Sequence, residues 1–147
     1  MDYEIDLCRA HSVIRLTVMA ETVTMELAEE MYRHLLEVTS EGGPYAAIFD
    51  FSATKNTTIR TTVVRSFGRH RPPAVPMGIC PFCGHPRRQV VVGPEPHISG
   101  LARVFAICAN AIGSEFQVVH TLEQAYGIVE ARPEEFTECL IRPHTTP

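Results

Sequence analysis

The stretch Tyr45–Phe51, which reads YAAIFDF, is followed by a turn rich in Ser and Thr and then by a segment with helical character. The same order of apolar strand, turn and amphipathic helix returns twice further along the chain. The three units are Tyr45–Phe51 with Thr57–Arg69, Gln89–Val92 with Ile98–Ile112, and Glu115–Val119 with Leu122–Glu130. Short apolar strands that alternate with helices are typical of a parallel sheet covered by helices.

The N-terminal segment has a different pattern. Tyr3–Arg9 alternates between apolar and polar residues, and Val13–Met19 follows after a short turn, which predicts an antiparallel hairpin. A helix is expected from Thr24, a good N-cap residue, to the stop at Gly42-Gly43-Pro44. We therefore predict an α/β fold: an N-terminal β-hairpin, then alternating helices and strands, in a mixed, mostly parallel five-stranded sheet with about four helices.

The 147 residues suit a single domain, which we place at residues 1–132, with a C-terminal tail at residues 133–147. Residues 71–88 interrupt the regular alternation with five prolines and a cysteine pair, and are interpreted as an insertion. No apolar run approaches the roughly 20 residues that span a bilayer, so no membrane association is expected. The acidic N-terminus does not resemble a signal peptide, and an odd count of five cysteines favours reduced thiols in the cytoplasm.

Charge is distributed unevenly along the chain. Residues 1–54 carry a net charge of −7, residues 55–103 carry +7 and residues 104–147 carry −4. The basic middle segment could attract phosphate or an acidic partner. Its arginines are dispersed over predicted helices and loops, however, so pairing with the acidic segments is favoured and nucleic-acid binding is not expected.

Short motifs in this order of elements resemble the STAS-like domains, the family of bacterial anti-sigma-factor antagonists and their relatives. They are Phe49-Asp50-Phe51-Ser52 at the end of one strand, Gly93-Pro94 at the end of the next, and Thr121-Leu122-Glu123-Gln124-Ala125 after the last. The resemblance covers roughly Tyr3–Ala131 apart from the insertion. It implies a non-catalytic regulatory or protein-interaction module that binds a protein partner or associates with itself as a homodimer.

Antagonist members of that family carry a phosphorylated Ser at the N-terminus of the second helix, within an Asp-Ser-Ser-Gly-like stretch. The corresponding stretch here is Asn56-Thr57-Thr58-Ile59, in which Thr replaces Ser and the Asp and Gly are missing. A phosphate at a helix N-terminus is physically favourable, but either threonine could instead simply cap the helix. The candidate phospho-acceptor or ligand-binding side chains of this and the neighbouring loops are Thr57, Thr58, His97, Ser99, His120 and Thr121.

Within the insertion, Cys80-Pro81-Phe82-Cys83-Gly84 resembles half of a zinc ribbon. The insertion precedes a parallel strand, so it should lie at the amino-end pole of the sheet, which is the edge where the parallel strands begin. The hairpin turn and the end of the second helix should lie there too. We expect a structural zinc ion held by Cys80 and Cys83 with two of four further residues. The full set of candidate ligands is Cys80, Cys83, His85, His11, Cys8 and His70.

Two other functions remain open at this point. Cys80 and Cys83 could form a thiol–disulfide redox pair, although no helix follows to lower a thiol pKa. The basic middle segment could make the chain a small-anion or nucleotide-binding domain. The sequence contains no recognisable catalytic set and no Gly-rich phosphate loop after a strand, so we do not expect an enzyme.

Overall fold

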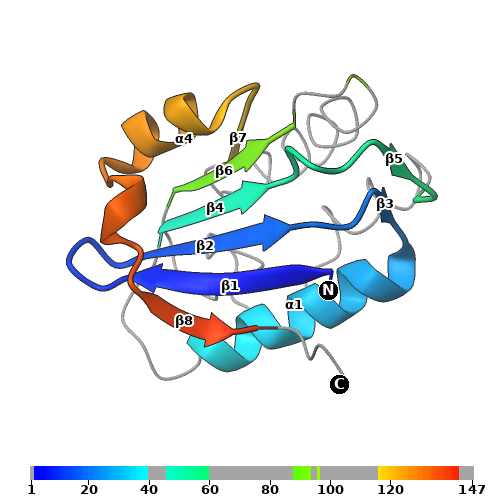
Figure 1. The fold of residues 1–147 in the computed structure, drawn as a ribbon, viewed down its shortest axis with the longest axis horizontal. Coiled ribbons are helices and arrows are strands. Elements are labelled where there is room, and N and C mark those ends of the chain that lie inside the picture. Colours follow the sequence, from blue (N-terminus) through cyan, green and yellow to red (C-terminus); the bar gives the residue numbers. More distant parts are fainter. Residues whose placement is uncertain (1, 40–45, 60–87, 94–95, 97–115, 143–147) are drawn as a thin grey trace.

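Six strands form one mixed sheet in the order β7-β6-β4-β2-β1-β8 (Figure 1). The structure is a computed structural model that describes residues 2–39, 46–59, 88–93, 96 and 116–142. Strands β2, β4, β6 and β7 are parallel, and β1 is antiparallel to both of its neighbours. The strands are β1 (Tyr3–Cys8), β2 (Val13–Val18), β4 (Ala46–Asp50), β6 (Gln89–Val92), β7 (Phe116–Val119) and β8 (Glu138–Ile141). The predicted α/β class, the hairpin and the mostly parallel sheet are confirmed.

One face of the sheet is covered by α1 (Met25–Thr39). The predicted cap is present, because the backbone N–H of Leu27 donates to Thr24 Oγ1 at 3.2 Å. Successive strand residues point to opposite faces, so alternate residues of the hairpin meet this helix. The core on this face includes Ile5, Leu7, Ile14, Leu16, Leu27, Met31, Leu35, Phe49 and Val91. The buried residues Leu27, Met31 and Leu35 recur every four positions, which is the spacing of one helix face.

The opposite face is covered by α4 (Leu122–Val129). A capping box begins this helix: Gln124 N–H donates to Thr121 Oγ1, while the Gln124 side chain accepts from the Thr121 backbone. The core between α4 and the sheet includes Cys8, Val13, Ala46, Ile48, Val90, Val92, Ala125 and Val129. The helix ends where Glu130 takes a left-handed conformation with φ 58°, and the chain then turns back toward the hairpin.

The prediction of five strands was wrong, because residues 133–141, which were expected to belong to a C-terminal tail, contain a short helix and a sixth strand of the sheet. A short 3-10 helix, η1 (Pro133–Glu135), follows α4, and Phe136 is buried in the core beneath it. Strand β8 then pairs antiparallel with β1. Pairing with β8 satisfies the backbone groups along the outer side of β1 that would otherwise form a sheet edge. Leu140 and Ile141 also pack against the α1 core.

A second correction concerns the segment after β4. Two-residue strands β3 (Thr22–Val23) and β5 (Asn56–Thr57) pair in parallel beside the main sheet. Thr57 thus lies in a strand, and the helix predicted over residues 57–69 does not begin there. The remainder of that helix, the insertion at residues 71–88 and the helix predicted over residues 98–112 lie outside the described residues. Within the described ranges, no helix is long and apolar enough to cross a membrane.

We predict that β8 contributes measurably to stability. Truncation after Phe136 removes β8, and we expect it to lower the free energy of unfolding by about 1–3 kcal/mol through loss of the half-buried Leu140 and Ile141. Truncation after Arg142 retains β8 and is the control. Urea unfolding monitored by circular dichroism measures both, and equal stability of the two truncated proteins would contradict a structural role for β8.

A second prediction follows from Tyr3, whose ring is buried and whose hydroxyl contacts His34 Nδ1 of α1. Burial and the nearby Glu30 carboxylate raise the pKa of Tyr3 from 10.0 to about 12. The folded protein therefore retains the proton between pH 10 and pH 12 while the unfolded chain loses it, so stability falls across this window. We expect the free energy of unfolding, measured by urea unfolding at each pH, to fall less between pH 10 and pH 12 for Tyr3→Phe than for the wild type. An equal fall in the two proteins would refute the raised pKa of Tyr3.

Candidate functional site

The hairpin turn and the segment after α4 meet at the amino-end pole of the sheet. Figure 1 shows both at the left end of the view, away from β3 and β5 at the right. The backbone N–H of Ala46, the first residue of β4, donates to Ser12 O at 3.0 Å, which fixes the turn beside the start of the parallel strands. The Arg88 side chain donates to Ile128 O at 3.2 Å, so α4 ends at this pole as well. The predicted position of the hairpin turn is confirmed.

Two residues of the turn region carry side chains that can act as metal ligands. Cys8 is the last residue of β1, pairs with Val13 and is fully buried on the α4 face. His11 lies in the turn, where it is exposed. Ser12 closes the turn with φ 54°, a left-handed conformation that lets the chain reverse within four residues. The turn thus places a buried thiol and an exposed imidazole at the same end of the sheet.

The third side chain comes from η1, far away in the sequence. Pro133 begins η1, and the Glu135 carboxylate turns back so that Oε1 accepts the Arg132 backbone N–H at 2.8 Å. Its other oxygen, Oε2, lies 3.0 Å from His11 Nε2. The hydrogen bond from Arg132 and the neighbouring His11 hold the pKa of Glu135 below its usual range. The carboxylate is therefore ionised and fixed in orientation at neutral pH.

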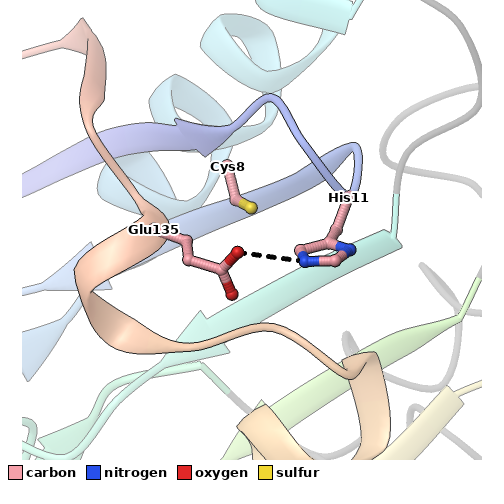
Figure 2. Close-up of side chains that lie close together, drawn as sticks. All are labelled: Cys8, His11 and Glu135. Carbon is pink, nitrogen blue, oxygen red and sulfur yellow. Dashed lines mark hydrogen bonds and ion pairs between the residues drawn. The ribbon is translucent and has the colours of Figure 1, made fainter.

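Cys8, His11 and Glu135 form one cluster in which the three potential ligand atoms lie within 4.8 Å of one another. Figure 2 shows the sulfur, the imidazole and the carboxylate converging from β1, the turn and η1. Thiolate, imidazole and carboxylate are the three side-chain types that bind zinc in proteins. The cluster has the composition and the compactness of a metal site.

An ion pair adjoins this cluster. Arg9 Nε and Nη2 donate to the two carboxylate oxygens of Glu138 at 2.6 and 2.7 Å. The hydrogen bond from Arg9 holds the pKa of Glu138 below its usual range. The turn is thus joined to the C-terminal segment at two side-chain contacts, one between His11 and η1 and one between Arg9 and the start of β8.

The predicted metal ligands divide into two groups. Cys8 and His11 are brought together, while Cys80, Cys83, His70 and His85 lie outside the described residues. Glu135 was not predicted as a ligand. Its segment contains Glu134, Glu135 and Glu138, and no spacing in the sequence distinguishes one of these carboxylates from the others. The distinguishing signal is spatial, since only the docking of η1 on the hairpin brings one of them to His11.

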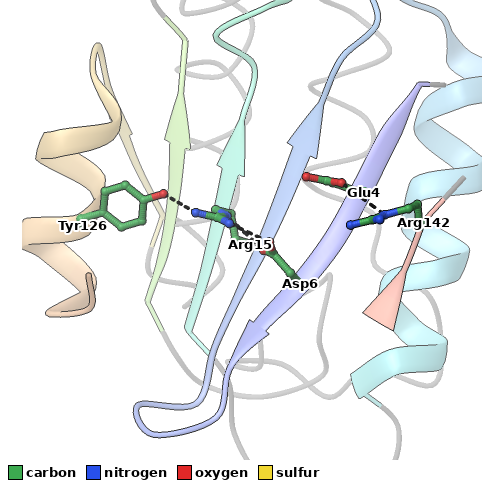
Figure 3. Close-up of polar contacts among 5 residues, drawn as sticks. All are labelled: Glu4, Asp6, Arg15, Tyr126 and Arg142. Carbon is green, nitrogen blue, oxygen red and sulfur yellow. Dashed lines mark hydrogen bonds and ion pairs between the residues drawn. The ribbon is translucent and has the colours of Figure 1, made fainter. Parts of the chain in front are cut away.

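A second polar cluster crosses the α4 face of the sheet. Arg15, in the middle of β2, donates to both carboxylate oxygens of Asp6 at 3.0 and 2.6 Å and to Tyr126 Oη at 2.6 Å (Figure 3). Its guanidinium also lies 4.5 Å from the ring centroid of Phe136. Burial alone would lower the pKa of Arg15, but the hydrogen bonds with Asp6 and Tyr126 outweigh it and the pKa is raised. Arg15 therefore joins β1, β2, α4 and the segment after η1.

The carboxyl-end pole, where the parallel strands end, is organised by main-chain and hydroxyl hydrogen bonds. Thr54, which is fully buried, donates to Ala20 O at 2.9 Å, and the backbone N–H groups of Lys55 and Asn56 both donate to Glu21 O. Asp50 accepts from the backbone and the hydroxyl of Ser52. The loop after β4 is thereby fixed on the segment that leads into α1.

The two threonines of the predicted phospho-acceptor stretch differ. Thr57 Oγ1 donates to Val23 O at 2.9 Å and accepts the Ile59 backbone N–H at 3.1 Å. Thr58 is bound through its backbone N–H, which donates to Val23 O, and its side chain is exposed. His120 and Thr121 are exposed at the same pole, at the start of α4, whereas His97 and Ser99 lie outside the described residues.

Comparison of the chain with protein-family models, with curated proteins and with solved structures gives no match. The site must therefore be interpreted from its own geometry and chemistry.

We predict that the Arg15 cluster is important for stability. Asp6→Ala leaves a largely buried guanidinium without its carboxylate and should lower the free energy of unfolding by about 2–3 kcal/mol. Glu21→Gln breaks the exposed pair with Lys55 and should cost about 0.5 kcal/mol or less. Urea unfolding at neutral pH compares the two variants, and similar losses in both would show that the Arg15 cluster contributes no more than a surface ion pair.

Proposed function

We propose that the chain is a STAS-like domain that acts as a non-catalytic regulatory module and binds a protein partner through the loops at its carboxyl-end pole. The order of elements supports the family assignment, because an N-terminal hairpin leads into a series of parallel strands that starts with β2. In such sheets, ligands and partners bind at the loops that follow the strands.

The observation that carries the proposal is the fixed loop after β4, which presents an exposed Thr58. Hydrogen bonds from Thr54, Thr57 and the Thr58 backbone attach this loop to residues 20–23. A loop that is ordered before binding loses little conformational entropy when a partner docks. Thr58 is also the residue of the predicted phospho-acceptor stretch whose hydroxyl is accessible, since Thr57 uses its hydroxyl within the loop.

In this proposal, phosphorylation of Thr58 regulates partner binding through the negative charge of the phosphate. Phosphorylation of the exposed Thr58 would add close to two negative charges to the surface of this loop. The Thr58 backbone is held by its hydrogen bond to Val23 O, so the loop cannot readily move to carry the phosphate away from a docked partner. The added charge would therefore change the electrostatic interaction with that partner. The phosphorylated and unmodified forms would then differ in partner affinity.

The test compares Thr58→Asp with Thr58→Ala. A partner is first isolated from the source cells with the unmodified chain and then purified, and its affinity for each variant is measured by calorimetry. If the partner is a second copy of this chain, sedimentation equilibrium replaces calorimetry. We expect Thr58→Asp to bind at least about tenfold more weakly than Thr58→Ala because of the charge placed in the interface.

Ala10→Asp is the control variant, since Ala10 is exposed in the hairpin turn at the opposite pole. It adds the same charge and should leave partner affinity unchanged. Equal affinities of Thr58→Asp and Thr58→Ala, or an equal loss in Ala10→Asp, would argue against partner binding at the carboxyl-end pole.

A further inference from the structure

We propose that Cys8, His11 and Glu135 bind one zinc ion that joins the hairpin turn to the C-terminal segment. This inference is independent of partner binding at the opposite pole. It also differs from the site expected around Cys80 and Cys83, because the three ligands come from the end of β1, the hairpin turn and η1.

The separations within the cluster suit a tetrahedral metal. Zinc binds nitrogen and oxygen at about 2.0–2.2 Å and sulfur at about 2.3 Å, so its ligand atoms lie roughly 3.3–3.7 Å from one another. His11 Nε2 and Glu135 Oε2 are 3.0 Å apart, and all three ligand atoms lie within 4.8 Å. Adjustments on the order of 1 Å therefore convert the observed arrangement into a coordination sphere.

The chemistry of the three groups selects zinc over the common alternatives. Calcium and magnesium take oxygen ligands, whereas a thiolate with an imidazole and one carboxylate suits zinc. Cys8 is fully buried, and its sulfur would bind zinc as the thiolate. His11 is exposed and leaves the fourth position accessible to a water molecule.

A hydrogen bond that would orient the Glu135 carboxylate toward a metal ion is already present. Carboxylates that bind a metal usually accept a further hydrogen bond that orients them. Glu135 Oε1 accepts the Arg132 backbone N–H at 2.8 Å, which leaves Oε2 directed at His11 (Figure 2). The carboxylate thus needs no new partner to be positioned for the ion.

Binding has a structural consequence because the ligands are distant in sequence. Cys8 and His11 belong to the N-terminal hairpin, while Glu135 lies directly before Phe136 and β8. An ion shared between them would fix the C-terminal segment to β1. Removal of zinc should therefore loosen β8 before it affects α1 or the parallel strands.

The experiment uses the full chain with Cys80→Ser and Cys83→Ser, so that any zinc bound by that pair is removed. After treatment with a chelator and dialysis, zinc binding is measured by calorimetry and by elemental analysis. We expect one zinc ion per chain and a melting temperature raised by about 5 °C or more at saturating zinc. Cobalt loaded in place of zinc should give a thiolate-to-metal charge-transfer band that is lost in Cys8→Ala and retained in Cys139→Ala.

Three variant pairs then assign the ligands. Glu135→Gln, His11→Asn and Cys8→Ala should each weaken zinc binding by more than about tenfold. Their matched controls are Glu134→Gln beside the site, His120→Asn at the opposite pole and Cys139→Ala on β8, and these should bind as the parent does. Glu135 and His11 are not buried, so their variants retain the fold even if Cys8→Ala does not.

Amide hydrogen exchange tests the structural consequence of zinc binding independently of the measured zinc content and affinity. Peptides that cover β8 should exchange faster after chelation in the parent and should exchange equally with and without zinc in Glu135→Gln. Absence of bound zinc in the parent would overturn the proposal. Equal zinc affinity of Glu135→Gln and Glu134→Gln would overturn it as well, since it would leave only a His11–Glu135 hydrogen bond beside a buried thiol.

Discussion

The structure depends on the burial of both faces of the β1–β2 hairpin. Its apolar residues Ile5, Leu7, Ile14 and Leu16 pack under α1, while Cys8 and Val13 pack on the opposite face with the α4 core. Because side chains alternate between faces, a shift of β1 by one residue along β2 would turn Asp6 toward α1 and away from Arg15. That arrangement would bury a carboxylate in an apolar core and leave Arg15 without its ion-pair partner, so the hairpin register is strongly specified.

The hairpin register also determines the two poles. Strand β2 starts directly after the turn and pairs in parallel with β4, so the turn lies where all the parallel strands begin. Arg15 then fixes the other layer, because its contacts with Tyr126 and Phe136 position α4 and the segment after η1 over the hairpin. The hydrogen bonds of Arg15 are all satisfied only when α4 is docked in this position. A polar side chain in the middle of a sheet face therefore makes the packing of the two layers specific.

Periodicity made the hairpin, α1, β4, β6, β7 and α4 predictable, since each presents a repeating apolar pattern or a capping signal. The same reasoning missed β8, whose residues Glu138–Ile141 are only half-buried or exposed and do not alternate. It missed β3 and β5 because strands of two residues have no period. Cys8 and His11 could be placed at one pole from topology, but Glu135 could not, because its position depends on the docking of η1 through long-range contacts.

Different kinds of contact stabilise the two poles of the sheet: hydrogen bonds to main-chain groups at the carboxyl-end pole, and side-chain pairs at the amino-end pole. The loop at the carboxyl-end pole is attached to residues 20–23 by hydrogen bonds that involve main-chain groups, and the Thr58 side chain is exposed. At the amino-end pole, His11 contacts Glu135 and Arg9 contacts Glu138 across more than 120 residues of sequence. Exposed ion pairs of this kind contribute little by themselves. A metal ion shared by Cys8, His11 and Glu135 would replace a weak contact with a strong one at the junction where the C-terminal segment joins the sheet.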